Sequence, residues 1–209
     1  MVRSLKVAAG RYVQEHSKLF VYTIVLFIVG VLFGAIVVNA LADGQKADLF
    51  NYLKGFFGLV NDQRLPDSAY VTWHSIATNL KMLGLIWILG LSIIGLPLIV
   101  VLMFLKGFTI GFTVGFLVDN FASKGLLFAI LAVLPQNLLI VPSLIIAGVA
   151  GIAFSLMLVR SRFTQNMPLY QKFLSYTILM LILGVCLVLA SFVEGYVSPL
   201  LMKMITPHL

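Results

Sequence analysis

The stretch between residues 106 and 151 constrains the fold of this chain more than any other. Only Lys106, Asp119 and Lys124 are charged in it, so it is apolar enough and long enough to cross a membrane more than once. The whole chain shares this character, with 61% hydrophobic residues, 10% charged residues and a mean hydropathy of +1.10. Such a composition excludes an ordinary soluble domain. No polar stretch is long enough for a separate soluble core, so residues 1–209 are predicted to form a single all-α membrane domain.

Small residues recur every four positions on the apolar segments. Gly107, Gly111 and Gly115 would share one face of a helix, where a second backbone can approach closely. The same spacing appears in an earlier segment and again near the end of the stretch. The helix-packing positions predicted from it are Gly30, Gly34, Gly107, Gly111, Gly115, Ser143, Ala147 and Gly151.

A broken-helix joint is predicted at Pro135, Gln136, Asn137 and Pro142. Proline removes a backbone hydrogen bond, and two amides at membrane depth must find partners. These amides either tie helices together or line a polar cavity or partner site. We expect a half-span over residues 125–134 followed by a full crossing, with one long kinked helix as the alternative.

Five membrane crossings are expected, with the N-terminus inside and the C-terminus outside. They are residues 19–41, 82–105, 107–118, 136–159 and 173–193, and residues 1–18 form a cytoplasmic lead. This arrangement puts eight basic residues and only Glu15 on the inner side, where Lys106 marks the inner end of the second crossing. The outer side then holds equal numbers of basic and acidic residues, as the positive-inside rule requires.

Residues 43–70 are the one sizeable polar interval and are predicted to hold an amphipathic helix outside the membrane. Its apolar positions recur at helical spacing and are Leu49, Phe50, Leu53, Phe56, Phe57 and Val60. They would rest on lipid or cap the helical bundle. The alternative role belongs to the polar face with Asp48, Asn51 and Lys54, which would dock a partner protein.

The residues supply no catalytic or metal-binding set. His16, His74 and His208 are far apart in sequence, Cys186 is the only cysteine, and no phosphate-binding glycine loop is present. The basic residues flank apolar segments instead of forming a stripe with aromatic residues, which argues against a nucleic-acid partner. The chain is therefore expected to be non-enzymatic, without a cofactor or metal.

Several motifs, taken in order, resemble one family of membrane proteins. The patterns are K-G-F-x-x-G-F-x-x-G from Lys106, L-P-Q-N-x-x-x-V-P-S from Leu134, and FGAIVVNAL and DLFNYLKGFFG nearer the N-terminus. Together they closely resemble stage II sporulation protein M of endospore-forming bacteria, over nearly the whole chain. The resemblance implies a role in forespore engulfment at the septal membrane, on the mother-cell side. It also implies two peptidoglycan-degrading partners, stage II sporulation proteins D and P.

Two hypotheses about function follow. The first is a non-enzymatic scaffold in the cell membrane that recruits wall-degrading partners to the sporulation septum. The second is a subunit of a small-solute transporter or channel, suggested by the broken helix with its midplane amides and by the glycine-rich helices. In that case a homodimer could enclose a path that a monomer cannot.

Overall fold

The computed structural model describes residues 13–61, 67–161 and 169–197. Nearly all of these residues are helical, and no strand occurs within these ranges. The elements in order are α2 (Ser17–Val37), the 3-10 helix η1 (Val38–Ala40), α3 (Asp43–Asn61), α4 (Ser68–Gly90), α5 (Gly95–Ser161), α6 (Leu169–Phe192) and the π-helix η2 (Val193–Val197). The predicted all-α membrane bundle is confirmed.

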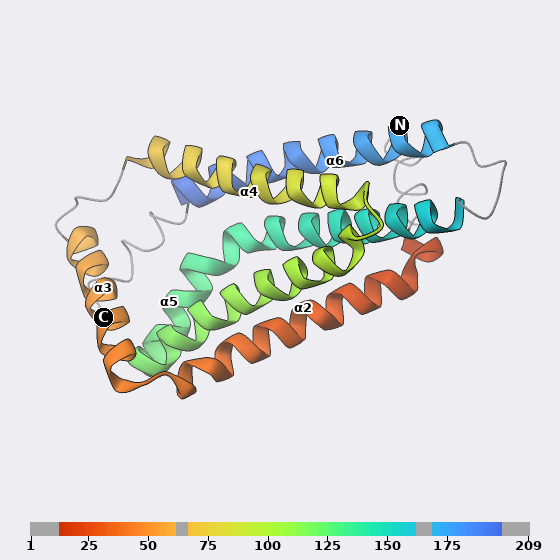
Figure 1. Cartoon of the computed structure of the whole chain (residues 1–209). Coiled ribbons are helices and arrows are strands. Elements are labelled where there is room, and N and C mark those ends of the chain that lie inside the picture. The colour runs from red at the N-terminus through yellow and green to blue at the C-terminus, as the bar shows by residue number, and fades with distance from the viewer. Residues whose placement is uncertain (1–12, 62–66, 162–168, 198–209) are drawn as a thin grey trace.

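The long helices run side by side along one axis (Figure 1). α3 lies across one end of this bundle. α5 runs along the axis twice, because it folds back on itself at the end that α3 crosses. The opposite end holds the start of α2, the turn from α4 to α5, the end of α5 and the start of α6. The described chain therefore enters the bundle at one end and leaves α6 at the other.

Ala122 is the point at which α5 folds back. Its backbone angles, φ 49° and ψ −127°, are far from helical, and it is the one non-glycine residue with positive φ in the described chain. We call residues 95–121 the first arm and residues 123–161 the second arm. The arms meet closely beside the bend, since a Cβ added at Gly125 would overlap the carbonyl oxygen of Leu117.

The predicted second crossing, residues 82–105, is wrong as a continuous helix. α4 ends at Gly90, and the chain turns before α5 begins at Gly95. Short-range hydrogen bonds build the turn, including one from the Gly95 N–H to the Ser92 carbonyl at 3.1 Å. The third predicted crossing, residues 107–118, becomes part of the same first arm. The turn is apolar, so hydropathy alone cannot separate it from a membrane span.

The helix break predicted at the prolines is also wrong. The second arm stays helical through Pro135 and Pro142, and the half-span expected over residues 125–134 is the beginning of the same helix. The arm bends along its course instead (Figure 1). Membrane helices tolerate proline, and between the two prolines Asn137 Nδ2 donates to the Val133 carbonyl, one turn back in the same helix, at 2.7 Å. The alternative of one long kinked helix is closer to the structure, although the chain folds back before the prolines.

Four segments of the described chain are long and apolar enough to cross a membrane. They are Ser17–Ala40, Gly95–Leu131, Val133–Val159 and Leu169–Tyr196. The predicted count of five exceeds these four, because the predicted crossings 82–105 and 107–118 both extend over the first arm. α4 is not among the four, although it runs alongside them in the bundle (Figure 1). α4 is more polar because its first half carries Thr72, His74, Ser75 and Asn79.

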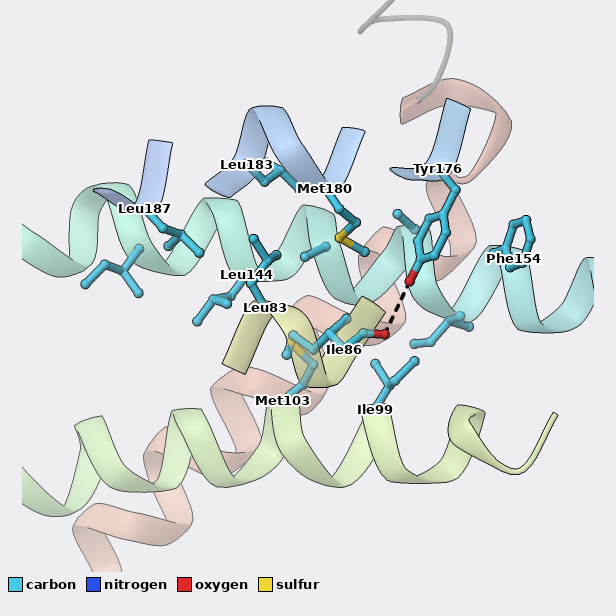
Figure 2. Packing of buried hydrophobic residues seen from close by; sticks show 14 of the residues in the cluster. Leu83, Ile86, Ile99, Met103, Leu144, Phe154, Tyr176, Met180, Leu183 and Leu187 are labelled. Carbon is cyan, nitrogen blue, oxygen red and sulfur yellow. Dashed lines mark hydrogen bonds between the residues drawn. The ribbon is translucent and has the colours of Figure 1, made fainter. Parts of the chain in front are cut away.

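The main core lies between α4, α6 and both arms of α5. In Figure 2, Ile99 and Met103 of the first arm lie beside Ile86 of α4. Tyr176 of α6 reaches into this core, where its hydroxyl donates to the Ile86 carbonyl at 3.2 Å and its ring stacks on Phe154 with a centroid distance of 4.8 Å. In a membrane, such packing stabilises helix association through van der Waals contact, because lipid is as apolar as the side chains.

Candidate functional site

A polar cavity of about 340 Å³ lies between the helices. α4, the two arms of α5 and η2 each contribute to its wall. The polar residues that line it are His74, Ser75, Thr78, Asn79, Lys106, Thr109, Thr113, Gln136, Asn137 and Glu194. Val133, Ile110 and Ile140 complete the lining. A cavity with this many polar groups inside a helical membrane bundle is a candidate functional site.

Lys106 places a cation well inside the first arm of α5, away from either end of that arm. It lies eleven positions after Gly95, which at 1.5 Å per residue puts it about 17 Å along the first arm. Lys106 therefore lies inside the apolar segment Gly95–Leu131, which is long enough to cross a membrane, and not at its end. The prediction that Lys106 marks the inner end of a crossing is therefore wrong. The basic excess on the expected inner side remains, with seven basic residues against Glu15.

Glu194 supplies the opposite charge from the end of α6. It lies in the π-helix η2, which widens the last turn of the helix; such turns are frequent at functional sites. Gly195 follows it and packs against α4, where a Cβ would overlap the Thr72 hydroxyl oxygen. This close approach holds Glu194 beside α4, where it lines the cavity.

A buried hydrogen-bond network holds the Glu194 side chain. The Ser75 hydroxyl donates to the Glu194 carboxylate. The Asn79 amide donates to the hydroxyl oxygens of Ser75 and Ser191 at 3.2 and 3.1 Å. The Ser191 hydroxyl donates in turn to the Leu187 carbonyl at 3.0 Å. A connected network in a low-dielectric interior fixes its members strongly, so α4 and α6 hold this carboxylate together.

The uncharged part of the lining offers hydrogen-bond acceptors. Thr109 and Thr113 donate their hydroxyl protons to carbonyls one turn back in the same helix, both at 2.9 Å. The side-chain amide of Asn137 likewise donates to the Val133 carbonyl, one turn back in its own helix. The oxygens of these side chains remain to accept hydrogen bonds from water or a ligand in the cavity.

The described residues contain no group of three or more His, Cys, Asp and Glu side chains that could hold a metal ion. What the cavity can do chemically follows from its two charges and its neutral acceptors. It is suited to binding a small polar molecule.

Sequence reasoning identified only part of this site. Gln136 and Asn137 were expected at a cavity or a helix contact, and both line the cavity. Pro135 and Pro142 stay within the second arm and do not line it. Lys106 is predicted at the end of a crossing, Glu194 falls just after the last predicted crossing, and Ser75, Thr78 and Asn79 fall between predicted segments, so none of them was predicted as a cavity residue. Their helical spacing was a usable signal: Lys106, Thr109 and Thr113 share one face, as do Ser75 and Asn79.

The predicted glycine faces of α2 and α5 lie against each other. A Cβ at Gly30 or Gly34 would overlap the carbonyl oxygen of Phe104 or Phe108, respectively. From the other side, a Cβ at Gly107 would overlap the Phe27 carbonyl oxygen. Figure 1 shows α2 following the first arm along its length.

The same contact continues toward the bend in α5. A Cβ at Gly111 would overlap the Val31 carbonyl oxygen, and one at Gly115 would press on Ala35. The second set of small residues faces the main core. Ala147 is fully buried, and Gly151 lies against Gly90. Ser143 is also buried, and its hydroxyl donates a hydrogen bond to the Leu139 carbonyl.

The predicted amphipathic helix is α3, and it lies apart from the cavity. Asp48, Asn51 and Lys54 are exposed, and Leu49, Phe50 and Leu53 are half-buried. The side chains of Phe56, Phe57 and Val60 lie outside the described part of the structure, as do residues 1–12 of the predicted lead.

Two contacts tie α3 to the end of the first arm. Lys46 forms an ion pair with Asp119 at 3.2 Å, and the Phe50 and Phe121 rings lie 6.1 Å apart. The Lys54 ammonium lies 4.8 Å from the Phe50 ring centroid. This residue of the expected docking face therefore contacts a side chain of its own helix.

A bundle of apolar helices around a charged, amide-lined cavity defines a polytopic integral membrane protein. Its family is clear from comparison with known proteins. The chain belongs to the stage II sporulation protein M family, whose model matches residues 23–199. This is therefore a sporulation-related membrane protein, and the family is not a known enzyme family. Neither a curated protein nor a solved structure matches the chain.

Proposed function

We propose that this protein is a non-enzymatic membrane scaffold that recruits peptidoglycan-degrading partners during forespore engulfment. The observation that carries the proposal is the position of α3, which lies across one end of the bundle with a polar face exposed (Figure 1). Family membership supports a role in sporulation. The partners proposed are stage II sporulation proteins D and P, at the septal membrane on the mother-cell side.

α3 is suited to docking because it is anchored and still open on one side. The Lys46–Asp119 ion pair and the contact of Phe50 with Phe121 hold it to the first arm. Its exposed residues include Asp48, Asn51, Lys54 and Tyr52, the last with 83% of its surface accessible. Tyrosine is enriched where proteins bind one another. A pre-positioned surface loses little freedom on binding, which favours affinity.

The charge distribution supports an outward-facing α3. The opposite end of the bundle carries Lys18 at the start of α2 and Lys172 at the start of α6. Basic residues at membrane boundaries favour the cytoplasmic side. In this orientation α3 faces the extracytoplasmic space, where wall-degrading partners act.

The test is capture of the extracytoplasmic domain of stage II sporulation protein P by the purified membrane protein. Asn51→Lys combined with Lys54→Glu changes the exposed face of α3 without touching its anchor. Exposed charge pairs contribute about 0–1 kcal/mol each, so for two changes we expect a partial loss of affinity, up to about thirtyfold. The matched control is Gln171→Lys with Lys172→Glu, two exposed positions at the opposite end of the bundle. Equal capture by both double variants would show that the partner does not bind at the exposed face of α3.

A second candidate function rests on the cavity. An ion or small solute could cross the bundle through a path that includes Lys106 and Glu194, as in a channel or transporter subunit. Solute or proton flux into liposomes that contain only this protein would support it. Flux that Glu194→Gln leaves unchanged would exclude the cavity as the path.

A further inference from the structure

The two charges in the cavity face a shared space without meeting. Lys106 comes from the first arm and Glu194 from η2. Both are among the described residues, and no direct ion pair joins them. The Ser75 hydroxyl donates to the Glu194 carboxylate, but none of the hydrogen bonds among the described residues engages the Lys106 ammonium. An ammonium has three donors, and Lys106 is half-buried in the cavity wall, so these donors are available to a ligand inside the cavity.

From this arrangement we propose that the cavity binds a small zwitterion, with its anionic group at Lys106 and its ammonium group at Glu194. A ligand with both charges satisfies both side chains and leaves the site electrically neutral. A simple anion would be attracted by Lys106 but repelled by Glu194. A simple cation would be attracted by Glu194 but repelled by Lys106. The paired charges therefore select against ligands with one charge.

The size and the remaining lining fit such a ligand. The cavity volume of about 340 Å³ exceeds the roughly 300 Å³ at which small-molecule sites begin. The oxygens of Thr109, Thr113 and Asn137 accept hydrogen bonds from an ammonium or hydroxyl group. This binding is independent of the scaffold role, because α3 contributes no residue to the cavity.

Two sources could supply this chemistry. The cavity reaches the protein surface, since His74 and Thr78 on α4 and Thr109 and Thr113 on the first arm are exposed. One source is the headgroup of phosphatidylethanolamine, which joins a phosphate to an ammonium. The other is a free amino acid.

The experiment measures binding to the full chain, purified in a lipid-free detergent, by calorimetric titration. The free probes are glycine, β-alanine and γ-aminobutyrate, in which the distance between the charges increases. Acetate and methylammonium serve as the two single-charge controls. Dihexanoyl phosphatidylethanolamine and dihexanoyl phosphatidylglycerol test the lipid source.

We expect at least one zwitterion to bind about tenfold more tightly than any probe with one charge, equivalent to about 1.4 kcal/mol. Binding of amino acids identifies a free ligand, and binding of phosphatidylethanolamine alone identifies a headgroup.

Lys106→Met with Glu194→Gln removes both charges together and leaves no unpaired charge to prevent folding. We expect this double variant to lose the preference for zwitterions, whereas Lys81→Met, on the exposed side of α4, keeps it. Zwitterions that bind no better than acetate, methylammonium or phosphatidylglycerol would overturn the proposal in the unmodified protein, whether or not any variant folds. The same conclusion follows if the double variant keeps the full preference.

Discussion

The Ser75 hydroxyl donates a hydrogen bond to the Glu194 carboxylate, although the two residues are 119 positions apart in sequence. This bond connects α4, the most polar of the helices that run along the bundle axis, to the π-helix that follows α6. Asn79 and Ser191 extend the contact into a buried network. The bond therefore joins two helices and also positions one of the two charges of the cavity.

Ser75→Ala is expected to lower the thermal stability of the purified protein. The change leaves the Glu194 carboxylate without this donor, and hydrogen bonds to charged groups contribute about 1.5–3 kcal/mol. Ser175→Ala is the control, because its exposed hydroxyl bonds only to the Gln171 carbonyl in its own helix, at 2.9 Å. Melting curves in detergent that shift equally for the two variants would show that the network contributes little.

Gly111→Ala is expected to loosen the contact between α2 and α5. A Cβ there would overlap the Val31 backbone, which cannot move aside as a side chain can, and overpacking of this kind costs about 1–3 kcal/mol. Gly84→Ala adds the same methyl group to α4, where nothing lies within 4 Å. That control should be neutral or stabilising by up to about 1 kcal/mol, because alanine favours helices. The measurement is the melting temperature of both variants. A Gly111→Ala protein as stable as the control would contradict the close approach of α5 to α2 at this position.

Ala122→Gly is expected to stabilise the protein. The backbone angles of Ala122, φ 49° and ψ −127°, cost an L-residue about 1–3 kcal/mol, and glycine avoids that penalty because it has no Cβ. Ala77→Gly, inside α4, is the control and should lose about 0.5–1 kcal/mol by the usual cost of glycine in a helix. The two melting temperatures should move in opposite directions. If Ala122→Gly lowers the melting temperature as much as Ala77→Gly does, the backbone at residue 122 does not have a positive φ.

Single-cysteine labelling tests the orientation of the bundle. In a Cys186→Ala background, Asn51→Cys on α3 should react with a membrane-impermeant maleimide in intact cells. Lys172→Cys, exposed at the other end of the bundle, should react only after the cells are permeabilised. These expectations follow from the basic residues at the α2 and α6 starts. The reverse pattern would invert the topology and remove α3 from the extracytoplasmic side.

The sequence by itself determined the class of this protein and its family. Membrane insertion depends on the summed hydropathy of successive residues, so composition and apolar length are enough to predict an all-α membrane bundle. Glycine spacing is also local information. Gly107 and Gly111 recur at the helical period, which places them on one face before any partner helix is known.

Only the tertiary structure decided where the helices end and which polar residues meet. The turn after Gly90 is as apolar as the spans beside it, and hydrogen bonds with Ser92 build it. The cavity depends on packing between helices distant in sequence: Lys106 and Glu194 line the same cavity because α5 folds back at Ala122 and α6 returns beside α4. Hydropathy is a sum over neighbours in the chain, whereas a cavity depends on neighbours in space, and for that physical reason the sequence pattern could not locate it.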